Sequence, residues 1–229
     1  MWPWSSRNTL FRFNEVWGYR GTFDGQGFDS DYNCSGTTFE YNLSADNAGG
    51  FFLICNWAKH VESGQSIGNS DTLIRHNISF NDHVRSFVLN GPVETVRIQE
   101  NIIYNTIEED LPVIIDSPWG RYAESVEVTG NLFYTTGTAR IFQGTWAGDG
   151  LGNWKYEGPI NREAIRFMGN AYTRVKDHEE VGMQRLDQEA SLGELIERLQ
   201  DDETARAGFS SLLQFLEGSR HWDILKESL

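Results

Sequence analysis

Apolar and polar positions alternate along several short stretches of the chain, and each of these stretches ends at an asparagine. The tetrapeptides FRFN, FEYN, IRHN, IQEN, VTGN and FMGN end at Asn14, Asn42, Asn77, Asn101, Asn131 and Asn170. Each tetrapeptide begins with Phe, Ile or Val, and its second position is mostly polar. Alternation with a period of two is typical of a short strand that buries one face. The pattern therefore predicts a strand that recurs along the chain.

The spacing of these asparagines indicates stacked repeats. Their intervals run from 24 residues, between Asn77 and Asn101, to 39 residues, between Asn131 and Asn170. Further apolar runs lie between the asparagines, at residues 49–55, 85–90, 111–116 and 139–144. In parallel strands stacked about 4.8 Å apart, asparagine amides at one position hydrogen-bond from strand to strand. The sequence therefore predicts an all-β fold, a right-handed parallel β-helix that forms a solenoid of about six coils.

A different pattern follows and predicts helices. Ser191 and Glu194 have the spacing of an N-terminal capping box, and apolar residues with helical spacing come after them. Two further helices are expected, over residues 204–216 and 222–229. We therefore divide the chain into a β-helix over residues 1–176 and an α-helical segment over residues 177–229. This segment is expected to cover the open end of the β-helix, where strand edges would otherwise be exposed, and partner binding is the alternative role.

The composition narrows the classes of ligand. The chain has 229 residues and a formal charge of -14, which argues against binding to nucleic acid or to an anionic membrane by simple attraction. Aromatic residues make up 13% of the chain and include eight Trp, and exposed Trp and Tyr rings are good platforms for the apolar faces of ligands. Cys34 and Cys55 can form a disulfide or stay buried thiols, so their redox state is left open.

The segment GFDSDYNCSGTTFEYNLSADNAGGFFLIC, with IRHNISFND after it, resembles the right-handed parallel β-helix repeat proteins of the pectate-lyase-like superfamily. The resemblance covers roughly residues 8–175 and leaves out the helical tail. It implies the β-helix fold and contact with carbohydrate, since relatives include glycoside hydrolases, polysaccharide lyases, epimerases and phage tail proteins. It also implies an extracellular or periplasmic location. The start, MWPWSSRN, lacks the basic and apolar parts of a signal peptide, and we expect that N-terminal coils are missing from this chain.

Asp29 and Asp31 form the first candidate site. On an outward-facing strand, residues two apart share a face, and their α-carbons lie about 6.6–7 Å apart. An inverting glycosidase holds its two carboxyl groups roughly 6.5–9.5 Å apart, with room for a water. Crowding of like charges would raise one pKa and supply an acid beside a base. A turn without chemistry and a calcium site made of both carboxylates and backbone carbonyls are the alternatives.

Asp46, Asp82 and His83 are further catalytic candidates. Asn47 and Asp82 each lie five residues after an asparagine of the ladder, so we expect them to stack in adjacent coils. If these residues border the same groove as the acidic pair, they complete its site, with His83 as an acid or as the group that orients a carboxylate. Capping of the turn after a strand is the alternative for Asp46 and Asp82.

Three residues are candidates for binding a sugar. Asp116 ends an apolar strand, and we expect it on the same side as the acidic pair, two or three coils and about 10–15 Å away. Trp57 and Trp119 lie in loops after corresponding strands. Their rings are expected either to stack on sugar faces or to pack against the exterior of the coils.

These patterns together predict a carbohydrate-active protein that takes a polysaccharide or an oligosaccharide, and hydrolysis of a glycosidic bond is the leading hypothesis. A non-catalytic binding protein is one alternative, and a calcium-dependent polysaccharide lyase or epimerase is another. The lyase is less favoured, because Lys59, His60 and Arg85 form no compact cluster beside the acidic pair and the family's lyase motifs are missing. No cofactor is expected apart from calcium in that alternative, and the oligomeric state is left open.

Overall fold

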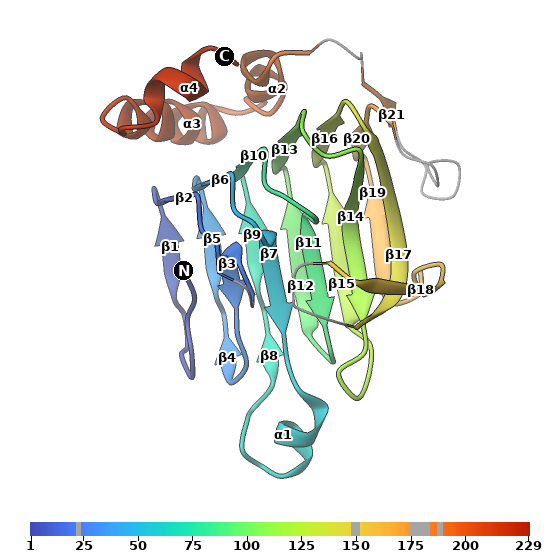
Figure 1. The fold of residues 1–229 in the computed structure, drawn as a ribbon. Coiled ribbons are helices and arrows are strands. Elements are labelled where there is room, and N and C mark those ends of the chain that lie inside the picture. The colour runs from blue at the N-terminus through green and yellow to red at the C-terminus, as the bar shows by residue number, and fades with distance from the viewer. Residues whose placement is uncertain (22–23, 148–151, 175–183, 187–189) are drawn as a thin grey trace.

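Three sheets of mostly parallel strands make up the larger part of the molecule (Figure 1). The computed structural model describes residues 1–21, 24–147, 152–174, 184–186 and 190–229. We refer to the sheets as sheet A, sheet B and sheet C, with eight, seven and six strands.

The strands of each sheet come from distant parts of the chain. Sheet A contains β1 (Leu10–Arg12), β5 (Thr38–Glu40), β9 (Leu73–Arg75), β12 (Glu94–Gln99), β15 (Glu124–Thr129) and β19 (Ile165–Met168), with β4 (Cys34–Ser35) and β8 (Asn69–Ser70) beside this path. Sheet B contains β2 (Glu15–Trp17), β6 (Leu43–Ala45), β10 (Ile78–Phe80), β13 (Ile102–Asn105), β16 (Leu132–Thr135), β20 (Ala171–Tyr172) and β21 (Gln184–Arg185). Sheet C contains β3 (Gln26–Ser30), β7 (Gly50–Cys55), β11 (Phe87–Asn90), β14 (Asp110–Ser117), β17 (Thr138–Trp146) and β18 (Trp154–Gly158).

The chain passes through the sheets in turn, so neighbouring strands of one sheet belong to successive passages. The strands β5, β6 and β7 follow one another in sequence and lie in sheets A, B and C. Each of them pairs in parallel with a strand of the next passage, β9, β10 or β11. Residues about 30 positions apart therefore become direct neighbours across a strand spacing of about 4.8 Å.

The asparagines of the repeating tetrapeptides form a continuous column where sheet A turns into sheet B. Side-chain amides join successive members at 2.8–3.0 Å, from Asn14 through Asn42, Asn77, Asn101 and Asn131 to Asn170. All members after Asn14 are buried. Each amide satisfies polar groups of the turn that water does not reach. The asparagine column predicted from the sequence is confirmed.

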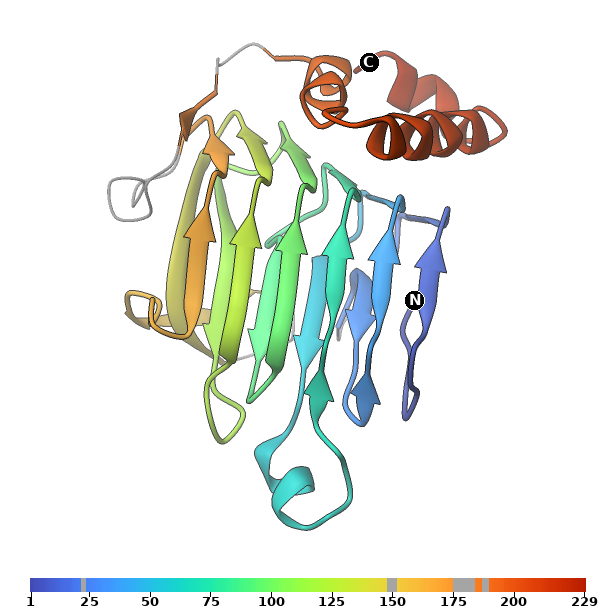
Figure 2. The same cartoon turned by 180° about the vertical axis from the view of Figure 1, so that it is seen from behind.

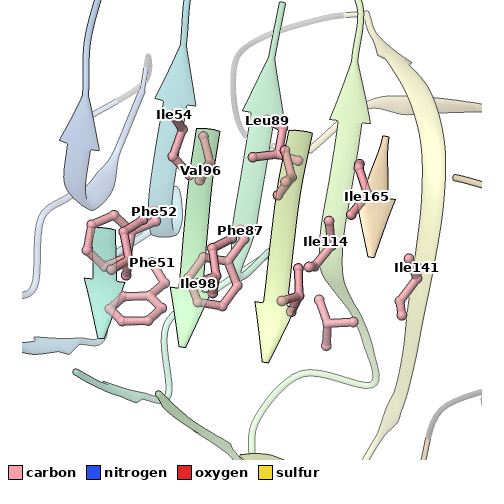
Figure 3. Packing of buried hydrophobic residues seen from close by; sticks show 14 of the residues in the cluster. Phe51, Phe52, Ile54, Phe87, Leu89, Val96, Ile98, Ile114, Ile141 and Ile165 are labelled. Atoms are coloured by element: carbon pink, nitrogen blue, oxygen red, sulfur yellow. The ribbon is translucent and has the colours of Figure 1, made fainter. Parts of the chain in front are cut away.

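Apolar side chains that point inward from the three sheets share one core. Figure 3 labels members of this core from sheets A and C. Phe52, Phe87 and Ile114 occupy the same register position on β7, β11 and β14 and all belong to this core. Leu53 and Val88, one position further along, belong to a separate cluster on the other face of sheet C. The period of two along a strand thus sends alternate residues to the core and to the outer face of this sheet.

The predicted fold class is corrected by this arrangement. The structure supports an all-β-dominated fold with three mostly parallel sheets and four short helices, in place of a right-handed parallel β-helix of about six coils. The sequence pattern suggested at least two strands per repeat, whereas three sheets are present, and β18 pairs with β17 in the antiparallel sense. Alternation identifies single strands, but it does not say how many sheets they form or how a hairpin joins them.

The C-terminal helices begin and end close to the predicted positions. They are α2 (Leu192–Arg198), α3 (Glu203–Leu216) and α4 (Trp222–Lys226). The capping box is confirmed: Ser191 Oγ accepts a hydrogen bond from the Glu194 backbone N–H, and the Glu194 carboxylate accepts one from the Ser191 backbone N–H. The remaining helix, α1 (Ala58–Glu62), lies between β7 and β8.

The C-terminal helices lie along the outer face of sheet B (Figure 2). Leu195, Phe209 and Leu212 of these helices share a buried cluster with Leu43 and Ile78 of sheet B. The expectation that the segment covers an open end of the strand stack was therefore wrong. The residue after each column asparagine from Asn42 onward is apolar and points outward, so this face of sheet B needs a cover of its own.

The boundary predicted between residues 176 and 177 lies outside the described residues. Within the described part of the chain, none of the helices combines the length and the apolar character needed to cross a membrane.

Candidate functional site

A cavity of about 300 Å³, here called the main cavity, lies on the outer face of sheet C. Its walls include Trp119, Trp146 and Trp154, and the last of these belongs to the antiparallel strand β18. Leu53 and Val88 lie on its apolar floor. Three carboxylates also line it, from Asp24, Asp29 and Asp31. A mostly apolar hollow with a few convergent polar groups, of a volume at the lower end of the usual range, is typical of a site for a small ligand.

A row of polar side chains crosses the floor of the main cavity. Cys55, Asn90 and Ser117 hold the same register position on β7, β11 and β14, and all three line the cavity. Asp31 directly follows Ser30, which pairs with the residue before Cys55, so it continues the row. With about 4.8 Å between strands, the row extends for about 14 Å. It offers hydrogen-bonding groups beneath aromatic walls, which is the combination that a sugar ring requires.

Two donors hold the carboxylate of Asp31. Its Oδ1 accepts a hydrogen bond from the backbone N–H of Tyr32 at 2.7 Å and one from the thiol of Cys55 at 3.2 Å. Among the described residues, Oδ2 has no partner. Burial raises the pKa of Asp31, and the two hydrogen bonds oppose that rise. The carboxylate is therefore fixed through one oxygen, while the other remains available to a ligand.

Asp29 is the most deeply buried carboxyl group of the site. Burial raises its pKa well above the usual range, and the charges of Asp31 and Asp24 add to this effect. Its Oδ2 accepts a hydrogen bond from Gln26 at 3.4 Å, whereas its Oδ1 is buried without a partner in the described part of the chain. Such surroundings favour the protonated form of the carboxyl group, which is the form that can act as an acid.

Arg85 brings a positive charge to the main cavity. Its Nε donates to the Gly49 carbonyl at 2.7 Å, and its guanidinium lies 5.6 Å from the ring centroid of Trp154. Burial lowers the pKa of Arg85 to about 10, and the charges of Asp24 and Asp29 oppose this shift. Within the described residues no carboxylate forms an ion pair with Arg85. The charge of Arg85 therefore acts on Asp24 and Asp29 through space.

The other three catalytic candidates lie outside the described lining of the main cavity. His83 hydrogen-bonds Asp46 at 2.8 Å and Glu108 at 2.9 Å. Asp82 is buried, and its Oδ1 accepts from the side chain of Asn47 at 3.0 Å, so the predicted stacking of these two residues is confirmed. The condition under which these three residues would complete the site, that they border the same groove as the acidic pair, is not met in the described lining of the main cavity. Asp46 and Asp82 follow strands of sheet B, whereas the acidic pair belongs to the edge of sheet C.

The three sugar-binding candidates lie in different places, and one of them lines the main cavity. Trp119 lines the main cavity, and Trp57 stacks on it with ring centroids 5.8 Å apart but is not part of the described lining. Asp116 pairs in register with the core residue Leu89 and is fully buried, so it points away from the cavity. Its carboxylate accepts hydrogen bonds from Ala123 and Gln143, and burial raises its pKa to about 6.

Several residues of the cavity were missed at the level of sequence. Asn90 and Ser117 could have been predicted from the sequence, because they hold the position in their apolar runs that Cys55 holds in its own. Asp24 and Trp154 carried no comparable signal. They reach the cavity from a turn and from an antiparallel hairpin, and neither of these follows from the repeat pattern.

Calcium binding at Asp29 and Asp31 stays a prediction. Among the described residues, no group of three or more His, Cys, Asp and Glu side chains is arranged to hold a metal ion. Calcium takes six to eight oxygen ligands, so the two carboxylates alone would need substrate oxygens or water to complete such a site.

Comparison with known proteins identifies one informative similarity. The chain is 34% identical over 110 residues to a lacto-N-biosidase from Bifidobacterium longum subsp. longum, and the match covers 45% of this chain and 6% of that protein. The chain thus spans only a small fraction of the length of the relative it matches. No family model matches the chain. No solved structure matches it either.

The expected membership of the pectate-lyase-like superfamily is corrected by these findings. No family model supports it, and the structure itself shows three sheets of mostly parallel strands without assigning them to a known family. The residues that suggested the resemblance have a structural explanation in this chain, because the asparagines and the apolar positions around them build the column and the core.

Proposed function

We propose that this protein acts on carbohydrate and hydrolyses a glycosidic bond of an oligosaccharide in the main cavity. The convergence of Asp24, Asp29 and Asp31 on one aromatic-walled cavity carries the proposal. The similarity to a protein named lacto-N-biosidase supports it and makes a lacto-N-bioside the first substrate to test. Glycosidases of most families work with a pair of carboxyl groups, one that donates a proton and one that acts on the anomeric carbon or on a water.

Asp31 is proposed as the group that acts at the anomeric carbon, either directly or through a water. The donors at its Oδ1 stabilise the ionised form and leave Oδ2 toward the ligand. As the bond between the anomeric carbon and the glycosidic oxygen breaks, the oxygen keeps the electron pair and receives a proton from a neighbouring carboxyl group. Water supplies the hydroxyl group that ends on the anomeric carbon, and its remaining proton restores the acid.

Two residues are candidates for the proton donor. Asp29 is favoured by its raised pKa, which favours the protonated form, and by its Oδ1, which has no hydrogen-bond partner among the described residues. Asp24 is favoured by its exposure, because it lines the cavity from a position that solvent reaches.

The test uses two lacto-N-biosides that differ in leaving group, one with p-nitrophenol and one with lactose. Asp31→Asn is expected to lower kcat about 10²–10⁴-fold on both substrates. The variant that lacks the proton donor, Asp29→Asn or Asp24→Asn, is expected to lose far more activity on the lactose conjugate, since p-nitrophenol leaves without protonation. Asp201→Asn, at an exposed carboxylate of the helical segment, is the matched control.

Unchanged hydrolysis by Asp31→Asn would refute the proposed role of that residue. Binding of either glycoside with no product on mass spectrometry would instead favour a carbohydrate-binding protein, for which the three Trp side chains of the main cavity already suffice. Calcium-dependent release of an unsaturated, ultraviolet-absorbing sugar would favour the lyase alternative.

A further inference from the structure

A second cavity of about 500 Å³ lies on the other side of Asp24, Asp29 and Asp31. We call it the N-terminal cavity, because Trp2, Trp4 and Tyr19 line it. These three aromatic side chains are 63%, 54% and 50% exposed, which is unusual for rings of this size. They gather around one hollow instead of being scattered singly, and such a cluster indicates a binding surface.

The two cavities meet at the carboxylates. Asp24, Asp29, Asp31 and Tyr32 line both of them, so these side chains form the boundary between the two spaces. A ligand that extends from one cavity into the other must pass the residues proposed to cleave it.

Tyr32 gives this boundary an aromatic connection. Its ring lies 4.5 Å from the ring of Trp4, on the side of the N-terminal cavity. It also lies 6.0 Å from the ring of Trp119, on the side of the main cavity. Both contacts are edge-to-face, with the edge of one ring against the face of the other, so Tyr32 joins the aromatic walls of the two cavities.

The orphaned oxygen of Asp29 is a second observation that points to a ligand. The residue is 9% exposed, and its Oδ1 has no hydrogen-bond partner among the described residues. An unpartnered buried polar atom destabilises the protein, and this cost disappears when a ligand supplies the missing bond. Because Asp29 lines both cavities, a group bound between them is in position to do so.

We propose that the N-terminal cavity binds the leaving part of the oligosaccharide, an uncharged sugar whose apolar face lies on Trp2 and Tyr19. The inference rests on the proposed function and extends it, because it states on which side of the scissile bond each part of the substrate lies. The sugar is uncharged because Asp24 and Asp31 line this cavity together with the buried Asp29, so an anionic sugar would be repelled. The N-terminal ammonium of Met1 also lies in the lining, but it donates to the Gly27 carbonyl and interacts with Asp29.

The difference between the two cavities sets the direction of the substrate. The main cavity is covered by the hairpin of β17 and β18 and carries the polar row of Cys55, Asn90 and Ser117, which suits selective recognition of the part that is cleaved off at its anomeric carbon. The N-terminal cavity has the more exposed aromatic side chains, which suits the part that must dissociate first.

The first test compares two substrates that share the sugar in the main cavity. Lacto-N-biose linked to lactose places a sugar in the N-terminal cavity, whereas lacto-N-biosyl fluoride has a leaving group too small to reach it. Trp2→Ala and Tyr19→Ala are expected to lower kcat/KM about tenfold on the lactose conjugate and less than about twofold on the fluoride. Phe215→Ala, at a 47% exposed aromatic residue of α3, is the control and is expected to change neither value.

The second test does not depend on turnover. Calorimetry with Asp31→Asn compares the affinity for the lactose conjugate with that for free lacto-N-biose, and the conjugate is expected to bind about tenfold more tightly. Adding Trp2→Ala is expected to abolish that difference without weakening the binding of lacto-N-biose. Equal affinities, no measurable binding of the conjugate, or an equal loss for both ligands would overturn the inference. A retained difference without hydrolysis by the unsubstituted protein would refute the proposed function and leave this subsite standing.

Discussion

Replacing Asn77 by Ala tests the asparagine column at its centre. The side chain is fully buried and makes bonds in both directions along the stack. Its Oδ1 accepts from the backbone N–H of Asn42 at 3.0 Å and from the side-chain amide of Asn42 at 2.8 Å. Its Nδ2 donates to the Phe39 carbonyl at 3.0 Å and to Oδ1 of Asn101 at 3.0 Å. Alanine removes all of these bonds and puts nothing in their place.

The expected loss of stability follows from the groups left without partners. The backbone N–H of Asn42 and its side-chain amide lose their acceptor in a region that water does not reach. Each buried polar group left unsatisfied costs about 1–3 kcal/mol. We therefore expect Asn77→Ala to lower the free energy of unfolding by about 3–5 kcal/mol, a large part of the total for a typical domain.

The matched control is Asn14→Ala at the end of the same column. Asn14 is partly exposed, and its amide donates to Asn42 at 2.8 Å, while its backbone N–H donates to the same oxygen and would remain. The cost expected for this variant is only about 0.5–1.5 kcal/mol. Urea titration followed by circular dichroism measures both variants, with the midpoint compared at constant slope.

Similar small losses for both variants would refute this reasoning. Such a result would mean that the turns between sheets A and B hold their shape through packing alone and that the amide column adds little. A lower slope for Asn77→Ala alone would point to a more compact unfolded state instead, and its midpoint would then not report the cost of the lost bonds.

Three further predictions concern the site, the helical segment and a buried charge. Cys55→Ala removes the thiol donor from Asp31, so the acidic limb of the kcat/KM profile is expected to move to higher pH, and Cys55→Ser is expected to restore it. Gly208→Ala places a methyl group 2.0 Å from the ring of Tyr41, so thermal unfolding is expected to show a loss of about 1–3 kcal/mol, although Gly to Ala normally favours a helix. Burial raises the pKa of Asp82 to about 6, so ionisation of this group destabilises the fold increasingly as the pH rises from about 4 to 6. Asp82→Asn is expected to flatten the dependence of the free energy of unfolding on pH in that window, to stabilise the protein at pH 7 and to leave catalysis unchanged. If the free energy of unfolding of the variant still falls from pH 4 to 6, this explanation is contradicted.

The strands and helices were largely accessible from the sequence, because their signals are local. Asn42 and Asn77 mark the turns after β5 and β9, and the spacing between Ser191 and Glu194 marks the start of α2. In the capping box, the side chain lies within a few residues of the backbone N–H group that it accepts from. In the asparagine column, the same side chain recurs at one strand position of each repeat.

The composition of the site was only partly accessible. Asp29 and Asp31 were found because two carboxylates at a spacing of two share a face of a strand. Asp24 was missed because it comes from a turn, and Asp82 was wrongly joined to the group because a position counted from the asparagine says nothing about which sheet follows. Counting positions from the asparagines shows which residues are neighbours within one sheet. Which residues of different sheets come close together depends on how the sheets are arranged in space.

The sequence by itself determined the recurring strands, the asparagine column and the helical character of the C-terminal segment, since these depend on periodicity and on hydrogen bonds between equivalent positions. Only the tertiary structure decided that the strands form three sheets, that the helices cover sheet B and that two cavities meet at the same carboxylates. The helices cover sheet B because its outer face is apolar and must be kept from water. The cavities form because turns and a hairpin bring side chains together that are distant in the sequence, and no local pattern encodes contacts of this kind.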